Sequence, residues 1–328
     1  MSKIISLLKK FSLVFTLSFF IVMILINPDE YSNSCILGLK LWAFTVLPSL
    51  LPFFFLTTLL TKTNTLLSLS EKLSPLSKFL FKQKGISFYA FIMSIISGYP
   101  VGSRIVYDLY SQKVITKSES EKLSVLASTS GVIFIIGVVG INMFKSKVIG
   151  LAIYLTHVLS AVLVGIIFRN HGDYSNETDN FKMNLNAENS LYESVYSSVI
   201  SSLIVGGFIS IFYVFTDVAL NNNLLLPFEF IFDKAFLFLG GNKEISRAFS
   251  VGLIECTRGA KELSLLPLSP LTVALSGALI SFSGISIIMQ SLAFLQKAKV
   301  NSWFFIKGKL LQTLLTFISL YLIFSLIL

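Results

Sequence analysis

Long apolar stretches separated by polar segments run along the chain, at residues 11–26, 36–61, 123–143, 148–168, 192–220, 271–295 and 302–328. A helix needs about 20 apolar residues to cross a hydrocarbon core about 30 Å thick, and most of these stretches reach that length. The pattern therefore predicts seven membrane-spanning helices. Lys residues precede the first stretch and no small-residue cleavage site follows it, so we expect residues 1–35 to form a retained N-terminal anchor helix.

A further apolar run, at 86–110, differs from these because Gly and Pro residues at 98–102 interrupt it in the middle. Its flanks at 62–84 and 113–122 are both rich in Lys, which marks the cytoplasmic ends of membrane segments. A segment with two cytoplasmic ends enters and leaves at the same face. We therefore predict a re-entrant hairpin, whose backbone groups need protein or a wet cavity around them. A single kinked span is the alternative.

Composition supports the membrane interpretation. Hydrophobic residues make up 54% of the 328 residues and charged residues only 13%, with a mean hydropathy of +0.80. A soluble domain carries about 25% charged residues, so soluble and disordered classes are both excluded. The net charge of +9 comes from Lys and Arg residues, which in a membrane protein mark the cytoplasmic loops. We therefore expect no nucleic-acid partner. The basic N-terminus and the connection 62–84 are predicted to be cytoplasmic.

Two motifs occur once on each side of a polar segment, 169–191, which we interpret as a linker. The first motif is a hydroxyl residue, Arg, three residues, an acid and Leu, found at 103–109 and 257–263. The second is Ser-x-Ser-Gly, found at matching distances further along, at 128–131 and 281–284. Conserved order and spacing within one chain indicate an internal repeat.

The repeat extends to the predicted elements. Each half contains three spans, a short amphipathic interfacial helix (73–82 or 228–239) and a hairpin. An odd number of spans separates the two hairpins, so we expect them to enter from opposite faces, as in the inverted repeats of secondary transporters. The predicted fold is thus an all-α polytopic membrane protein with an inverted-topology repeat. Its halves are 36–168, with a hairpin at about 86–110, and 192–328, with a hairpin at about 242–263.

Three strings carry a family resemblance: Ser-Gly-Tyr-Pro-Val-Gly-Ser-Arg at 97–104, Leu-Pro-Ser-Leu-Leu-Pro-Phe at 47–53 and Gly-Leu-Ile-Glu at 252–255. With them the chain resembles the YlbJ family of sporulation integral membrane proteins from about residue 36 onward. The resemblance implies a domain related to the gate region of concentrative nucleoside transporters. It also implies a role in spore-forming bacteria, where the protein would move dipicolinic acid from the mother cell across the outer forespore membrane.

Two Arg residues at matching positions in the hairpins suggest how an anion would bind. A charged residue near the bilayer centre costs about 3 kcal/mol or more, so it usually faces a cavity or a partner. Planar guanidinium groups bind carboxylates with two hydrogen bonds, and Arg104 and Arg258 could each take one carboxylate of a dicarboxylate. Alternatively, Asp108 and Glu262, four residues further on, neutralise them within their own helices.

The candidate binding shell combines these Arg residues with nearby hydroxyls and backbone N–H groups. The candidate substrate-binding residues are Gly98, Tyr99, Pro100, Gly102, Ser103, Arg104, Ser128, Ser130, Thr257, Arg258, Ser281, Ser283 and Gly284. The candidates for coupling to a proton or cation are Asp108, Glu255 and Glu262. Within span 148–168, His157 is either a proton relay or a hydrogen-bonding partner of a neighbouring helix.

We find no enzyme motif and expect no cofactor or metal, since His171 stands in the linker without partners and the two Cys are far apart. The expected partners are a small anionic substrate, the lipid bilayer, a coupling proton or cation and a second copy of the chain. A nucleoside-type transporter and a non-transporting sporulation scaffold are the alternative functions.

Overall fold

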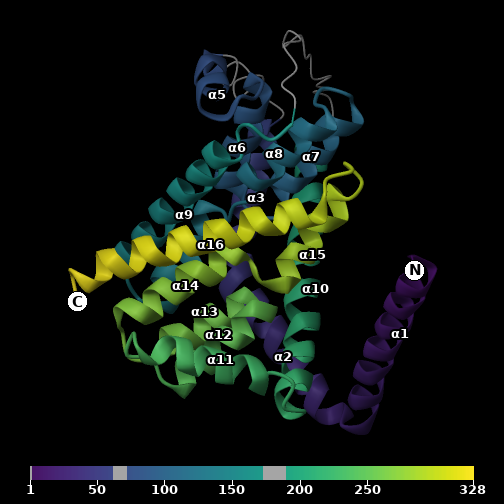
Figure 1. Cartoon of the computed structure of the whole chain (residues 1–328), viewed down its shortest axis with the longest axis vertical. Helices are drawn as coiled ribbons and strands as arrows, with labels where there is room; N and C mark the ends of the chain where they lie inside the picture. Colours follow the sequence, from purple (N-terminus) through teal and green to yellow (C-terminus); the bar gives the residue numbers. More distant parts are fainter. Residues whose placement is uncertain (1, 62–71, 173–189) are drawn as a thin grey trace.

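The computed structural model describes residues 2–61, 72–172 and 190–328, and in these ranges it consists of helices without strands (Figure 1). The earlier elements are α1 (Ser2–Ile26), α2 (Pro28–Leu41), the π-helical η1 (Trp42–Val46), α3 (Leu47–Thr61), α5 (Ser74–Phe81), α6 (Gly85–Ser97), α7 (Val101–Ser111), α8 (Lys117–Leu126), the π-helical η2 (Ile133–Met143) and α9 (Lys147–Ile167). The later ones are α10 (Ser190–Asn221), α11 (Leu226–Leu237), α12 (Lys243–Ile254), α13 (Cys256–Leu265), α14 (Pro270–Phe282), α15 (Gly284–Leu295) and α16 (Ser302–Ser325).

Four helical segments are long and apolar enough to cross a membrane: α9, α10, α16 and the α14–α15 pair. Two bent pairs, Val14–Ile26 with Pro28–Val46 (105°) and α5 with α6 (87°), bring the number to six if each is one span. An all-α polytopic membrane protein is therefore confirmed. Most of the predicted linker, residues 173–189, lies outside the described residues.

The prediction of one continuous span at 123–143 is wrong. Helix α8 ends at Leu126, residues 127–131 are not helical, and η2 begins after them. The Ser-Thr-Ser-Gly sequence accounts for this first break, because Ser and Thr side chains compete for backbone hydrogen bonds and Gly weakens a helix. The span at 271–295 has a second break at Ser283, which has a left-handed φ of 84° and is followed by Gly284 at 65°. Both breaks fall in the Ser-x-Ser-Gly motifs.

Two pairs of helices fold back on themselves as hairpins. In hairpin 1 (α6 and α7), a Cβ on Gly102 would lie 2.9 Å from the Ser94 hydroxyl. In hairpin 2 (α12 and α13), a Cβ on Gly259 would lie 2.2 Å from the Cα of Gly252. Residues seven or eight apart in a continuous helix are separated by more than 10 Å along its axis, at about 1.5 Å per residue. These contacts therefore require the chain to reverse direction.

The same order of elements occurs twice: a short helix, a hairpin, a broken helix and a long helix. The hairpins are also packed reciprocally, since α7 contacts α15, beyond the second break, and α13 contacts η2, beyond the first. The long helices α9 and α16 contact each other, and α16 crosses the molecule in front of α9 and α14 (Figure 1). Each hairpin therefore closes against the broken helix of the other half as well as its own.

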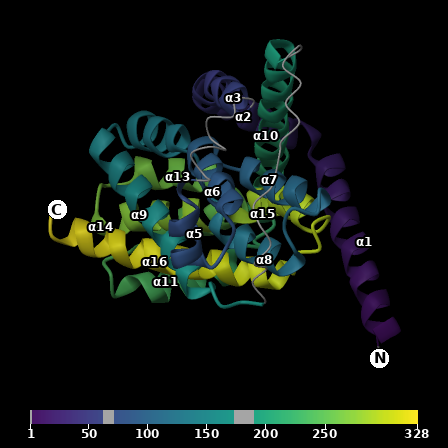
Figure 2. The same ribbon diagram turned by 90° about the horizontal axis from the view of Figure 1, so that it is seen from above.

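Helix α9 shows how the structure separates lipid from protein. One face exposes large apolar side chains at a spacing of four residues, from Leu151 through Leu155 and Leu159 to Leu163. The opposite face is buried and contains small or polar residues, among them His157. A polar interior with an apolar exterior is the arrangement expected where hydrocarbon is the solvent. Helix α1 lies at the periphery in both views (Figures 1 and 2).

Candidate substrate cavity

The two hairpin tips and the two helix breaks meet around one cavity of about 510 Å³, part of which is open. The helices α7, η2, α13 and α15 all begin there. Its lining combines apolar side chains with hydroxyl, amide and carboxyl groups. The lining residues are Val46, Leu50, Phe54, Ser97, Gly98, Tyr99, Ser130, Gly131, Phe134, Val205, Ile209, Glu255, Thr257, Ser286, Ile287 and Gln290.

At the tip of hairpin 1, backbone packs directly on the backbone of the first break. A Cβ on Gly98 would lie 2.4 Å from the Gly131 nitrogen, and Gly98 has a left-handed φ of 79°. The Ser94 hydroxyl is 2.7 Å from the Ala127 carbonyl oxygen and 2.6 Å from the Thr129 hydroxyl. Backbone groups at the break have lost their hydrogen bonds within the helix, and buried backbone groups need a partner. The Ser94 hydroxyl supplies part of these bonds.

The tip of hairpin 2 is closed by Glu255, the residue between its two helices. The Glu255 carboxylate accepts hydrogen bonds from the backbone N–H groups of Thr257 (3.1 Å) and Arg258 (2.7 Å), and so caps α13. A carboxylate is stabilised at the positive end of a helix dipole. Gly284 of the second break lies against this tip, since a Cβ there would be 3.0 Å from the Cys256 nitrogen.

His157, on α9, connects the two breaks. The backbone N–H of Ser130 donates to its Nε2 at 3.0 Å, which leaves the ring proton on Nδ1. Nδ1 lies 2.8 Å from the Ser281 hydroxyl, which donates in turn to Thr316 at 2.9 Å. Of the two roles predicted for His157, hydrogen bonding to neighbouring helices is the one observed.

A fully buried Lys side chain lies behind Tyr99, which lines the cavity. The Nζ of Lys309 on α16 donates to the Tyr99 hydroxyl (2.6 Å), the Ser128 carbonyl oxygen (2.9 Å) and the Gln312 side-chain oxygen (3.0 Å). The Tyr99 hydroxyl donates to the same Ser128 carbonyl at 3.0 Å, so both groups meet at the first break. Among the described residues, no carboxylate forms an ion pair with Lys309.

Two buried hydroxyls in the cavity wall have no hydrogen-bond partner within the described structure. They belong to Ser97, at the end of α6, and Ser286, in the first turn of α15. Buried polar groups are normally paired, and leaving one unpaired costs about 1–3 kcal/mol. Their position in the wall makes them the natural partners of polar groups on a bound molecule.

The structure brings some of the predicted site residues to the cavity. Gly98, Tyr99, Ser130, Thr257 and Glu255 line it. A second group lies behind the wall as structural support. Pro100 is the N-cap residue of α7, and Gly102 packs on Ala127. The Ser128 carbonyl accepts from Lys309, Ser281 binds His157, and Ser283 and Gly284 form the second break. The buried Ser103 hydroxyl has no hydrogen-bond partner among the described residues.

The two Arg residues are paired with acidic side chains and lie outside the cavity lining. The side chain of Arg104 is 56% exposed and lies 3.9 Å from Asp108, outside the cavity lining. Arg258 pairs with Asp217 of α10 at 2.7 Å and with Glu262 at 2.9 Å, and it also lies outside the lining. Both Arg residues are thus paired within the protein, which is the alternative that their spacing offered.

Five residues in or next to the cavity wall were not predicted as site residues: Lys309, Gln312, Gln290, Ser97 and Ser286. Lys309 and Gln312 lie three residues apart in an otherwise apolar span, and this was the available signal, because polar residues inside a span face its protein interior. Ser97 and Ser286 give no comparable signal, since Ser is common in all spans of this chain.

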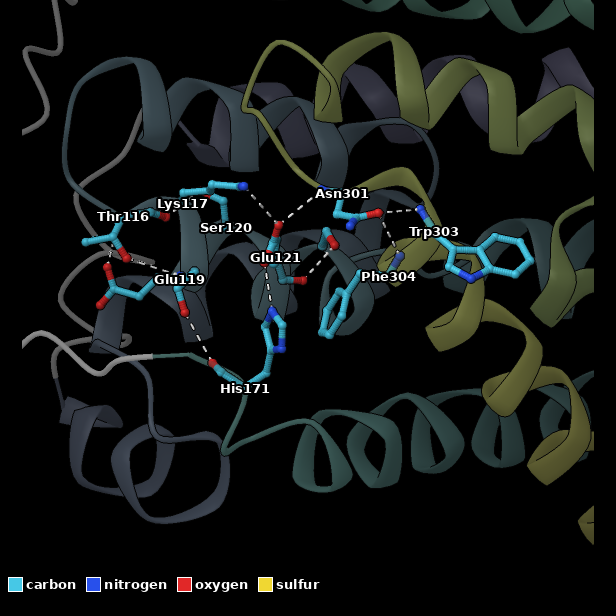
Figure 3. Close-up of polar contacts among 11 residues, drawn as sticks. Thr116, Lys117, Glu119, Ser120, Glu121, His171, Asn301, Trp303 and Phe304 are labelled. Carbon is cyan, nitrogen blue, oxygen red and sulfur yellow. Dashed lines mark hydrogen bonds and ion pairs between the residues drawn. The ribbon is translucent and has the colours of Figure 1, made fainter. Parts of the chain in front are cut away.

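The expectation that His171 has no partners is also wrong. Its Nε2 lies 2.7 Å from a carboxylate oxygen of Glu121, and its ring stacks on Phe304 with 4.0 Å between centroids (Figure 3). The other Glu121 oxygen accepts from the backbone N–H of Asn301 at 3.2 Å. This cluster connects α8, the end of α9 and the start of α16, away from the cavity. The described residues contain no group of three or more His, Cys, Asp or Glu residues suited to a metal, and both Cys are free.

Apolar helices of spanning length, with lipid-type surfaces and a polar interior, define a multi-pass integral membrane protein. The chain is 26% identical to the sporulation integral membrane protein YlbJ of Bacillus subtilis (strain 168), over 93% of this chain and 81% of that protein. The similarity extends along nearly the whole chain and supports its membership of the YlbJ family. No protein-family model matches the chain. No solved structure matches it either.

Proposed function

We propose that the chain transports a small anionic metabolite, which binds in the cavity between the hairpin tips. The observation that supports this most strongly is the meeting of two hairpins and two broken helices at one cavity. Secondary transporters place their substrate at such discontinuous helices, whose N-termini face anionic groups. The order of elements repeats, which supports an internal repeat, and we propose that its two halves are inverted.

Dipicolinic acid is the substrate we propose, moved across the outer forespore membrane during sporulation. This choice rests on the family resemblance. The cavity is compatible with it, since apolar side chains such as Phe54 and Phe134 suit a flat ring while the Ser97 and Ser286 hydroxyls can donate to carboxylates. Lys309 supplies positive charge behind Tyr99. Glu255, which lines the cavity, is the candidate for coupling to a proton or cation.

Ligand binding to the purified full-length chain tests this proposal. Dipicolinate should raise the thermal unfolding midpoint, because a ligand that binds only the folded state stabilises it. Ser286→Ala should weaken that shift, whereas Ser291→Ala should not, since Ser291 is an equally buried, unpartnered Ser of α15 outside the cavity lining. Ser97→Ala and Ser87→Ala form the same pair on α6.

Uptake of labelled dipicolinate into proteoliposomes then separates transport from binding. Uptake that is absent although the ligand binds would favour a sporulation scaffold with a ligand site. A nucleoside-type substrate is the second candidate, favoured by the Glu255 carboxylate and the Gln290 amide in the lining, which suit a neutral polyhydroxylated molecule. Stabilisation by nucleosides and not by dicarboxylates would establish that alternative.

A further inference from the structure

A buried Lys surrounded by neutral oxygens is unusual and calls for an explanation. The Lys309 side chain is 0% exposed, and moving a charge out of water is costly unless hydrogen bonds and partners compensate. Three oxygens surround Nζ within 3.0 Å: a hydroxyl, a backbone carbonyl and an amide oxygen. The Tyr99 ring adds a cation–π contact, with its centroid 4.9 Å from Nζ.

This set of oxygens is of the kind that binds a metal cation. In transporters with broken helices, backbone carbonyls of the unwound segment coordinate the coupling Na⁺. The Ser128 carbonyl belongs to such a segment, and the Tyr99 hydroxyl comes from the tip of the hairpin that closes on it. A positive group there holds the hairpin tip and the break together by sharing their oxygens.

We propose that Lys309 is a tethered cation that fills the place of a coupling Na⁺ at the junction of hairpin 1 and the first break. The ammonium group is attached to α16, so this junction is held without binding an ion from solution. It follows that the fold does not respond to Na⁺ at this position. It also follows, resting on the proposed function, that uptake does not require Na⁺ and that the substrate anion meets the positive charge of Lys309 behind Tyr99.

Cation rescue of a cavity variant tests the assignment without any substrate. Lys309→Ala removes the propylammonium part of the side chain, so its thermal unfolding midpoint in detergent should fall by several degrees. Propylammonium chloride or NaCl should restore part of that loss, and 1-propanol or choline chloride at equal concentration should not. Lys307→Ala, an exposed Lys on the same helix, is the matched control and should behave like the wild type.

Two outcomes would overturn the assignment: a Lys309→Ala protein that responds to all the salts alike or to none, and a wild-type protein that Na⁺ stabilises by several degrees over choline. The wild-type measurement keeps the test decisive if Lys309→Ala does not fold. Lys309→Met, which refills the space with an apolar chain, should show no rescue. Because these readouts contain no substrate, a failure of dipicolinate binding would count against the proposed function and leave this result standing.

Discussion

Single residues in this protein are constrained most strongly where two backbones touch. Gly98 and Gly131 come from different elements, and neither position leaves room for a side chain between them. Gly98 also has a combination of φ (79°) and ψ (−167°) that favours Gly almost exclusively. The Ser-Gly-Tyr-Pro string is therefore explained first by packing of the hairpin tip, and its Tyr by the bond to Ser128.

Gly98→Ala should be among the most damaging small substitutions in the chain. A strained backbone costs about 1–3 kcal/mol, and the new Cβ would meet the Gly131 nitrogen, which cannot move aside cheaply. We expect a clear fall in the thermal unfolding midpoint. Gly207→Ala, in α10 where a Cβ meets nothing within 4 Å, should leave the midpoint unchanged or raise it slightly. Equal midpoints for the two variants would contradict this packing.

His157 should couple the two halves energetically. His157→Ala removes its bonds to Ser130 and Ser281, and leaving buried groups unpaired costs about 1–3 kcal/mol. In a double-mutant cycle with Ser281→Ala, the two losses should be less than additive, because they share one hydrogen bond. The cycle can be measured from unfolding midpoints in detergent. Strict additivity would show that the bond contributes nothing.

At the scale of helices, the sequence predicted both hairpins but neither of the two breaks. Gly and Pro at 98–102 predicted hairpin 1, and repeat spacing located the second motif around 257. Both breaks were missed, because apolar residues dominate the stretch 123–143 and its five polar residues do not interrupt the pattern. Only one of the two ion-pair partners of Arg258 was predicted. Glu262 follows from helix spacing, whereas Asp217 lies on α10 and requires the tertiary fold.

Arg258→Ala should loosen hairpin 2 from α10. Breaking a largely buried ion pair by removing one partner costs about 3–5 kcal/mol, since Asp217 is left unpaired. Asp217→Asn in the same chain should recover part of the loss by removing that unpaired charge. Arg104→Ala is the control and should cost less than about 1 kcal/mol, because its pair with Asp108 is exposed. A larger effect of Arg104→Ala than of Arg258→Ala on the unfolding midpoint would refute this assignment.

For the whole molecule, reciprocal packing predicts that the two hairpins move together. Helix α7 rests on α15 and α13 rests on η2, while His157 connects the breaks from which both η2 and α15 start. Opening either side of the cavity therefore shifts surfaces that hold the other side. Such coupling is what alternating access requires, because the two faces of a transporter must not open together.

Cys256 reports on that opening, since it is 1% exposed at the tip of hairpin 2. In a Cys35→Ser background its thiol should react slowly with a maleimide reagent, and only when hairpin 2 moves off Gly284. Dipicolinate should change that rate several-fold by shifting the population of open and closed states. Cys35 in a Cys256→Ser background, half-buried on α2, should react at a rate independent of the ligand. If Cys256 reacts as fast as Cys35 and ignores the ligand, hairpin 2 is not a gate. If it never reacts, the hairpin belongs to a rigid scaffold.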